Sequence, residues 1–323
     1  MGRGAIEDGK LNESVVMLDG DAYNLVGIVT APARQPPGAS RPAVVFLNAG
    51  FLHRVGPNRL YVRLARALAT MGHLTLRFDF SGIGDSPARR DRLSSNQAYL
   101  QETLRAMDHV ERQFGIGRFI MFGLCSGADV AFIAALRDPR VAAAILINPS
   151  VGGNPASAEA SPGTLQGEVR SSTQMRYYRK KIGQWRSWMR LLTFKSDYRV
   201  AWRTLRDTSM RALRKPNRPR TSLQSAAFAP LRTLLSRDVQ LLGIYSEGSE
   251  TLDLLRLSFG ANTQHLAKEF PNLRIEEIKD VDHVFTPLWA QDVLATTVQS
   301  WVSSLKPPPE RDAPESSPIR SQI

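Results

Sequence analysis

Apolar runs without polar interruptions alternate with amphipathic stretches along most of the chain. The runs at residues 43–48, 118–124 and 141–148 have the composition of strands buried on both faces of a sheet. Between them, residues 58–72 and 94–115 carry apolar side chains at helical spacing, and each stretch ends at a glycine. Alternating strands and helices predict an α/β fold with a mostly parallel central sheet and helices on both faces.

Further elements at both ends of the chain extend this pattern. Residues 14–30 contain two apolar stretches around an Asp-Gly-Asp turn, which predicts a β-hairpin. Residues 239–246 and 273–278 predict two more strands. Residues 251–270 predict one or two helices, and residues 286–305 predict a closing helix.

The alternation is interrupted at residues 150–230, which predict no strand and are strongly basic. Residues 170–220 alone hold 16 Lys and Arg against 2 Asp and Glu, whereas the rest of the chain holds 26 against 28. The net charge of +12 is therefore a property of one segment. Charge confined in this way describes a local surface, and it predicts an inserted cap on a near-neutral core.

The predicted division of the chain follows from this interruption. Residues 14–150 and 233–305 form the two parts of the core, and residues 151–232 form a basic helical cap inserted between them. Residues 306–323 have the composition of a disordered tail.

The composition of the chain limits which kinds of cross-link and metal site it can form and in which cellular compartment we expect it. A single cysteine excludes an internal disulfide and a cysteine-cluster metal site, and it fits a reducing compartment. The N-terminus has no apolar signal region, and no window approaches the apolar length that spans a bilayer. We therefore expect a cytoplasmic protein without a metal or cofactor; the sequence leaves the oligomeric state open.

The single cysteine lies in a five-residue pattern that predicts a nucleophile elbow. A glycine, any residue, a nucleophile, any residue and a glycine expose a side chain at a strand-to-helix turn, and Gly123, Cys125 and Gly127 fit that pattern. The helix N-terminus and a neighbouring histidine should favour the thiolate of Cys125. The alternative is a small buried cysteine in an inactive scaffold.

The catalytic base is predicted from its position after the last strand. Of the five histidines, only His283 lies in the loop between that strand and the closing helix. His53 follows the first buried run, close to the expected mouth of the site. His109 and His265 fall within predicted helices and read as surface residues, and His73 opens a strand.

The acid that orients the histidine should follow the strand at residues 239–246. Ser249 stands where an aspartate is expected, so the sequence departs from the usual pattern. Glu250 and Asp253 are both candidates, favoured over Glu247, and the sequence does not separate them.

The oxyanion hole is predicted from two backbone segments. Ser126 follows the nucleophile, and its N–H group is one candidate donor. The small-residue turn after the first buried run offers Gly50 and Phe51 as the second. Asp79, at the end of a strand near the same rim, is expected to accept hydrogen bonds from loop amides and to have no catalytic role.

The assembled motifs resemble those of α/β-hydrolases in the serine aminopeptidase-like group. The resemblance rests on NAGFLHRVGPNRLYVRLARALATMG, LRFDFSGIGDS, GLCSGAD, YSEG and DHVFTP, which follow one another in the expected order, and it covers residues 14–305. More narrowly, the chain resembles hydrolases encoded with exosortase A and exopolysaccharide systems (the exosortase A system-associated hydrolase 1 group). Polyhydroxyalkanoate synthases and dienelactone hydrolases are also similar in placing cysteine in the elbow.

The resemblance implies a hydrolase or acyltransferase that acts on an ester or thioester and has a role in exopolysaccharide synthesis or export. The order of nucleophile, acid and histidine is that of α/β-hydrolases. A second hypothesis is a catalytically degenerate hydrolase-fold protein that serves as a binding or membrane-surface accessory.

The predicted cap adds candidate substrate and membrane contacts. Trp185 and Trp188 alternate with arginines at near-helical spacing. They are candidate substrate-binding residues, together with His53 and Arg54 near the mouth. A basic, Trp-rich amphipathic helix also fits an anionic membrane surface or a lipid-linked substrate; alternatively its apolar stripe packs over the site as a lid. No nucleic-acid module is recognisable, so we expect no nucleic-acid partner.

Overall fold

The computed structural model describes residues 11–20, 23–32, 41–149, 229–259 and 269–305. Within them, eight strands form one sheet in the order β1-β2-β4-β3-β5-β6-β7-β8. The strands from β4 to β8 run parallel, whereas β1 pairs with β2 and β2 with β4 in antiparallel fashion. The strand bounds are Leu11–Leu18 (β1), Leu25–Pro32 (β2), Ala43–Leu47 (β3), Thr75–Phe78 (β4), Phe119–Leu124 (β5), Val141–Ile147 (β6), Gln240–Ser246 (β7) and Leu273–Ile278 (β8).

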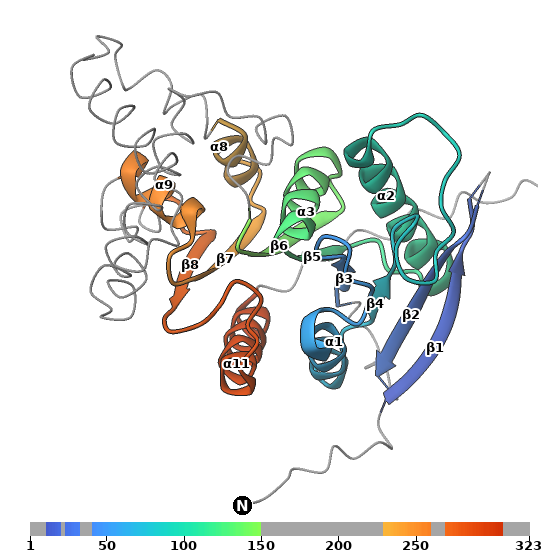
Figure 1. The fold of residues 1–323 in the computed structure, drawn as a ribbon, viewed down its shortest axis with the longest axis horizontal. Coiled ribbons are helices and arrows are strands. Elements are labelled where there is room, and N and C mark those ends of the chain that lie inside the picture. Colours follow the sequence, from blue (N-terminus) through green and yellow to red (C-terminus); the bar gives the residue numbers. More distant parts are fainter. Residues whose placement is uncertain (1–10, 21–22, 33–40, 150–228, 260–268, 306–323) are drawn as a thin grey trace, which may run out of the picture.

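Helices cover both faces of this sheet (Figure 1). Helices α1 and α11 lie on one face, and α2, α3 and α8 lie on the other. The helix bounds are Pro57–Arg59 (the 3-10 helix η2), Leu60–Thr70 (α1), Ser95–Phe114 (α2), Ser126–Arg137 (α3), Ala229–Leu235 (α8), Glu250–Phe259 (α9) and Leu288–Ser304 (α11). The predicted α/β architecture is confirmed.

The apolar runs build the centre of the sheet. Every residue of β3 and β5 is buried, because helices pack against both faces of these strands. Alternate side chains along them enter two separate cores. Val45 and Met121 join the core under α2 and α3, whereas Phe46 and Phe122 join the core under α1 and α11. The predicted entrance hairpin, β1 and β2, extends the sheet at one edge.

Local signals set the ends of helix α2. Ser94 is its N-cap and forms a capping box with Gln97, so two otherwise unpaired backbone donors gain partners. Gly115 closes the helix in the left-handed conformation with φ 68°, which glycine adopts without a steric penalty. Both ends agree with the predicted bounds.

Several predictions need correction or lie outside the described residues. His109 is buried and not on the surface, because α2 turns this part of its face toward the sheet. Helix α8 spans Ala229–Leu235, and its Leu234 and Leu235 pack into the core. Residues 151–228 of the predicted cap, His265 and the predicted tail (306–323) lie outside the described residues. Among the described helices, none combines the length and apolar character needed to cross a bilayer.

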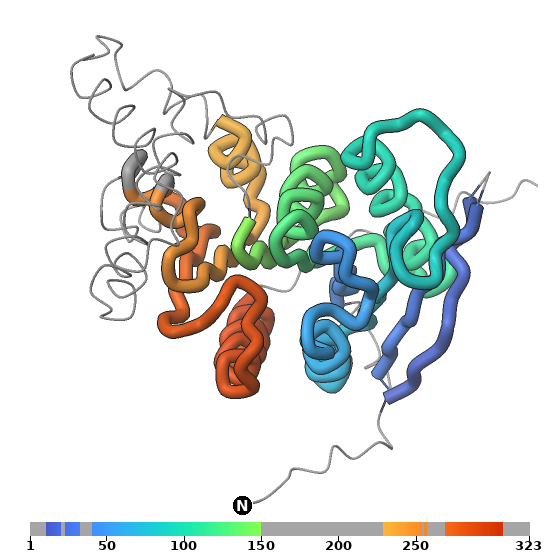
Figure 2. The backbone as a smooth tube through the Cα atoms, viewed as in Figure 1, coloured from blue at the N-terminus to red at the C-terminus, as the bar shows by residue number. Residues whose placement is uncertain are grey.

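The carboxyl ends of the parallel strands place the predicted site residues along one edge of the sheet. The backbone path in Figure 2 runs from β8 through residues 279–287 into α11, so the loop that carries His283 turns at this edge. The junction of β5 and α3 lies near the middle of the sheet, and Cys125 occupies it.

Candidate active site

The backbone at Cys125 has the form of a nucleophile elbow. Cys125 lies between the last residue of β5 and the first residue of α3, with φ 56° and ψ −125°. This conformation is strained for a residue with a side chain, and it persists only where the surroundings enforce it. The Cys125 N–H donates to the carbonyl of Ile147 in the neighbouring strand β6 at 2.9 Å, which anchors the turn.

Both glycines of the elbow are required by close backbone contacts. A Cβ atom on Gly123 would lie 2.2 Å from the carbonyl of Gly127. A Cβ atom on Gly127 would lie 2.6 Å from the carbonyl oxygen of Asn48 and 2.7 Å from that of Leu47. The start of α3 therefore packs directly on the end of β3, and only glycine allows this approach.

The Cys125 thiol is half-buried, and its environment favours the protonated form. Burial raises the pKa of the thiol, the Ser126 backbone N–H lowers it, and the charge of Asp129 raises it further, so the net direction is upward. The sequence predicted the opposite direction. The helix N-terminus does contribute, through the Ser126 N–H, but desolvation outweighs it.

His283 lies in the loop between β8 and α11, as predicted. Burial lowers the pKa of its imidazole, and the neighbouring Asp282 carboxylate raises it by less, so the ring favours the neutral form. The backbone carbonyl of His283 accepts a hydrogen bond from the Asn148 side chain at 2.8 Å. The ring itself makes no hydrogen bond with a residue of the described ranges, so neither of its nitrogens is fixed by one.

The structure does not join either candidate acid to His283. Glu250 is the exposed first residue of α9, and Asp253 is buried one turn later. Ser249 accepts from the Leu252 N–H at 3.5 Å, in the manner of a helix cap. The carboxylate that influences the ring is that of Asp282, which the sequence analysis did not consider.

Asp282 is tied to its own loop. Its carboxylate accepts from the Thr286 N–H at 2.7 Å and from the Thr286 hydroxyl at 2.6 Å. Burial is the largest single influence and raises the pKa of this carboxyl, but the two bonds from Thr286, its own backbone N–H and the charge of His283 together lower it by more, so the net direction is downward. The carboxylate next to the histidine in sequence thus favours its charged form and bonds to Thr286.

The predicted oxyanion segments meet at the elbow. The Gly50 N–H donates to the Ser126 hydroxyl at 2.8 Å, which holds the loop after β3 against the start of α3. Gly50 has φ 58°, and its amide already has an acceptor. Within the described ranges, the backbone N–H of Phe51 has no acceptor and that of Ser126 interacts only with the Cys125 thiol, so these two are the donors open to a ligand.

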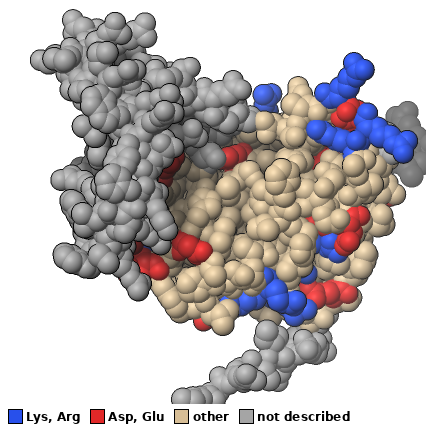
Figure 3. Space-filling model, in the orientation of Figure 1, with Lys and Arg blue, Asp and Glu red and all other residues tan. Residues whose placement is uncertain are grey.

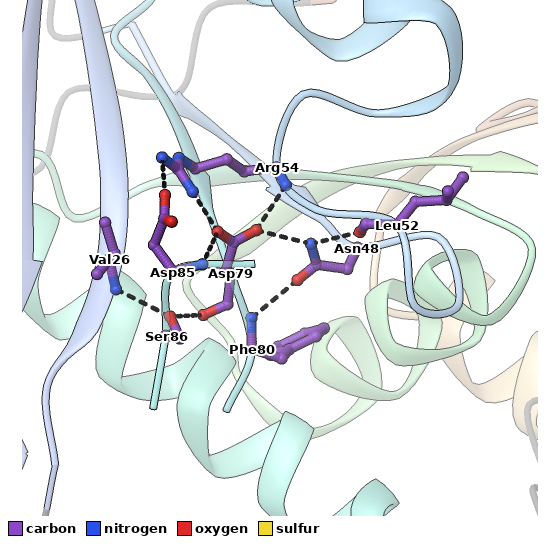
Figure 4. Close-up of polar contacts among 8 residues, drawn as sticks. All are labelled: Val26, Asn48, Leu52, Arg54, Asp79, Phe80, Asp85 and Ser86. Carbon is purple, nitrogen blue, oxygen red and sulfur yellow. Dashed lines mark hydrogen bonds and ion pairs between the residues drawn. The ribbon is translucent and has the colours of Figure 1, made fainter. Parts of the chain in front are cut away.

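Asp79 anchors the loop that carries Gly50, as predicted for loop amides (Figure 4). Its fully buried carboxylate accepts from the Arg54 N–H at 2.5 Å, the Asp85 N–H at 3.3 Å and the Asn48 side chain at 3.2 Å. The Arg54 guanidinium forms ion pairs with both Asp79 and Asp85. The charge of Arg54, which was predicted to bind substrate, is therefore paired with two carboxylates of the protein.

Large apolar side chains are exposed on the loop after β3 and on the first turn of α11. Phe51 is 91% exposed, and Leu288 and Trp289, in the first turn of α11, are 69% and 50% exposed. In the view of Figure 3, charged side chains lie mainly toward the margin of the visible face. His53 is exposed in the loop after β3. Trp185 and Trp188 lie outside the described residues.

Two asparagines at strand ends were missed by the sequence analysis. Asn48 follows β3, accepts from the Phe80 N–H at 2.8 Å and donates to the carbonyl of Leu52 at 2.9 Å. Asn148 follows β6 and bonds the histidine loop. A signal for both residues was present in the sequence, because each ends an apolar run that predicts a buried strand. A polar side chain at that position lies at the carboxyl edge of the sheet, where the neighbouring loops offer it hydrogen-bond partners.

Comparisons with known proteins agree with this architecture. A family model described as serine aminopeptidase, S33, matches residues 39–212, just over half of the chain. No curated protein sequence gives a match.

Solved structures show the same fold at low sequence identity. Proline iminopeptidase from Mycobacterium smegmatis is 17% identical, with 90% of this chain and 98% of that chain covered and a TM-score of 0.51. Dienelactone hydrolase from Anabaena variabilis is 14% identical (91% and 98% covered, TM-score 0.51). An esterase from Pyrococcus furiosus is 13% identical (91% of each chain covered, TM-score 0.51). These likenesses confirm the α/β-hydrolase fold.

Proposed function

The chain belongs to the serine aminopeptidase (S33) family of α/β-hydrolases, and we propose that it cleaves or transfers an acyl group through a covalent intermediate on Cys125. The observation that carries this proposal is the strained backbone of Cys125 between two sterically required glycines. A side chain that only fills space has no need of such a turn, whereas a nucleophile must project from it.

The proposed reaction begins from a neutral thiol and a neutral imidazole. The raised pKa of Cys125 and the lowered pKa of His283 both favour this pair over a thiolate–imidazolium pair. The sulfur attacks the acyl carbon while His283 takes the thiol proton. The N–H groups of Phe51 and Ser126 then donate to the oxyanion of the tetrahedral intermediate.

The second half of the reaction returns the proton. Collapse of the intermediate expels the alcohol or thiol, which takes the proton from His283, and leaves an acyl thioester on Cys125. Water, losing a proton to His283, attacks this thioester; the C–S bond then breaks, the acid leaves, and the Cys125 sulfur takes the proton back from His283. An acceptor alcohol in place of water gives acyl transfer.

The substrate in this proposal has an apolar acyl chain and an anionic or lipid-linked carrier. The exposed Phe51, Leu288 and Trp289 favour an apolar chain over a polar one. The basic segment at residues 170–220 favours an anionic carrier or an anionic membrane surface. The resemblance to exosortase-associated hydrolases would place that carrier in exopolysaccharide synthesis. An anionic acyl thioester should then react faster than a neutral ester of equal chain length.

Intact-mass analysis with p-nitrophenyl esters and acyl thioesters of increasing length tests the proposal. We expect the mass of one acyl group on wild-type protein, mapped to Cys125, and none on Cys125→Ala. His283→Ala should slow acylation by roughly 10²- to 10⁴-fold, the contribution of a general base. Because burial lowers the pKa of His283, the acylation rate should fall only at a pH below about 6.5, where the protonated ring can no longer accept the thiol proton.

Ser126→Ala provides a matched control at the adjacent hydroxyl. This variant keeps the backbone N–H and removes only the hydroxyl, so the adduct should still form on Cys125. An adduct located on Ser126, or turnover equal in wild type and Cys125→Ala, would contradict the proposal.

A non-catalytic binding protein is the second candidate function. Within the described ranges, the His283 ring has no carboxylate hydrogen bond, and desolvation raises the pKa of Cys125. A scaffold that has lost catalysis would show these same features. The absence of any adduct across all chain lengths, with wild type and Cys125→Ala alike, would favour it.

A further inference from the structure

The carboxyl end of β6 connects the nucleophile to the histidine. The carbonyl of Ile147, the last residue of this strand, accepts the backbone N–H of Cys125 at 2.9 Å. The next residue, Asn148, donates its side-chain amide to the backbone carbonyl of His283 at 2.8 Å. Two adjacent residues of one strand thus hold the two groups that the proposed reaction requires.

The Asn148 side chain also binds the end of β7. Its amide oxygen accepts from the backbone N–H of Ser246 at 2.9 Å and from the Ser246 hydroxyl at 3.2 Å. Asn148 is only 4% exposed, so these bonds have little competition from water. The side chain therefore joins the strand before the candidate acids to the loop of the histidine.

The backbone of Asn148 suits this role. Its φ is 45°, in the left-handed region that asparagine enters more readily than most residues. Its own N–H donates to the carbonyl of Ile244 at 2.9 Å, which fixes the turn at the end of the strand. The amide is consequently aimed from a rigid base.

The loop that carries His283 is also anchored at positions on either side of the histidine. The Glu247 carboxylate accepts from the Asp280 N–H at 3.2 Å near the start of the loop, and Phe285 is fully buried beyond it. Among the hydrogen bonds of the described residues, the one from Asn148 is the one that reaches His283. Its loss leaves the loop anchored on both sides while releasing the residue between.

We propose that Asn148 is a positioning residue that sets the place of His283 relative to Cys125. The inference rests on the proposed function, because it assigns His283 the proton transfer. Asn148 contacts neither the thiol nor the ring, and it acts through the backbone carbonyl of His283. A displacement on the order of 1 Å between base and nucleophile can slow a reaction about 10²-fold.

Two variants separate the functions of the Asn148 side chain. Asn148→Asp keeps an acceptor for Ser246 and replaces the donor to His283 with a second acceptor. Asn148→Gly removes the side chain and tolerates the positive φ. We expect each to lower the rate of Cys125 acylation by roughly 10- to 100-fold. Ser246→Ala removes one bond to the same side chain without touching His283, and it should change the rate less than about 3-fold, since the backbone N–H bond remains.

A double-mutant cycle with His283→Ala shows whether the effect passes through the histidine. If it does, Asn148→Gly has little further effect once His283 is replaced, so the two losses do not multiply. Losses that multiply in full would overturn the proposal, because Asn148 would then act by another route.

Histidine ring titration by NMR provides a readout that needs no activity. Wild-type His283 should titrate below its ordinary pKa because of burial, and in Asn148→Gly its pKa should rise toward the ordinary value as water reaches the ring. Ser246→Ala should titrate as wild type does. An unchanged pKa in Asn148→Gly overturns the role of Asn148. A wild-type protein that forms no acyl adduct overturns the proposed function, and the titration still decides for or against Asn148.

Discussion

Cys125 and its flanking glycines illustrate how one residue's conformation depends on atoms far away in sequence. The positive φ of Cys125 carries a cost on the order of 1–3 kcal/mol, which the surrounding contacts must offset. The bond from Cys125 to Ile147 and the contact of Gly127 with the end of β3 supply that restraint. Strain at the nucleophile is therefore maintained by two neighbouring strands.

Gly127→Ala tests this dependence. The new Cβ would overlap the carbonyl oxygens of Leu47 and Asn48, so β3 and α3 must separate. We expect a loss of about 1–3 kcal/mol in the free energy of unfolding, measured with urea, and at least a tenfold slower acylation of Cys125.

Gly115→Ala is the control for that substitution. Gly115 has φ 68° and open space around its Cβ position, so an alanine there costs about 1–2 kcal/mol through backbone conformation alone. It should lower stability while leaving the acylation rate of Cys125 as in wild type. Equal effects of the two variants on acylation would show that the elbow responds to stability and not to local packing.

At the scale of elements, hydrogen bonds from polar side chains join neighbouring loops where the strands end. Asn48 and Asp79 join the loop after β3 to the loop after β4, and Asn148 joins the loops after β7 and β8. The helices and strands supply the frame, but these buried polar contacts set the loops that carry the donors and the base.

Asp79→Asn should destabilise the protein far more than Asp85→Asn. Both carboxylates pair with Arg54, but Asp79 is fully buried whereas the Asp85 side chain is 66% exposed. Loss of the Asp79 charge leaves a mostly buried guanidinium with one exposed partner, at a cost of about 3–5 kcal/mol. Loss of the Asp85 charge should cost less than about 1 kcal/mol. Urea unfolding of the two variants measures the difference, and equal costs would contradict the assigned roles.

The elements could be predicted because their signals are local. Uninterrupted apolar runs predicted β3, β5 and β6, while apolar side chains at helical spacing and a terminal glycine predicted α2. The burial of His109 could not be read locally, because a polar ring on an amphipathic helix faces either way until the packing partner is known.

Site residues were predictable where a motif fixes their backbone and unpredictable where a tertiary contact selects them. The elbow at Cys125 required only a strand, a helix and two glycines. The bond from Asn148 spans 135 residues of sequence to His283. The direction of the Cys125 pKa likewise depends on how much the thiol is desolvated, which spacing along the chain does not reveal.

At the scale of the whole molecule, several buried groups make folding depend on pH in the same direction. Burial lowers the pKa of His73, and the charge of Arg41 lowers it further, although the bond from its Nδ1–H to the Pro42 carbonyl raises it. The unfolded chain therefore binds this proton more readily than the folded one. The stabilising contribution is complete above the ordinary pKa of about 6.5 and is lost as pH falls below it.

His73→Asn should flatten the pH dependence of stability between about pH 7.5 and 5.5. Asparagine offers an N–H near the position of Nδ1 and does not titrate, so the bond to Pro42 is retained without the proton linkage. Urea midpoints across this range give the comparison, and a His73→Asn curve as steep as wild type would refute the assignment.

The order of strands in the sheet has a consequence for synthesis on the ribosome. β3 lies between β4 and β5, and both of these strands follow it in the chain. The elbow is complete only once β6 has also emerged, because the backbone N–H of Cys125 donates to the carbonyl of Ile147 in that strand. His283 follows Asn148 by 135 residues. At roughly 5–20 residues per second, translation of that interval takes on the order of ten seconds. In the proposed mechanism, Cys125 of a growing chain cannot be acylated during this interval, because His283 has not yet been synthesised. A chain that ends before β8 is therefore inactive.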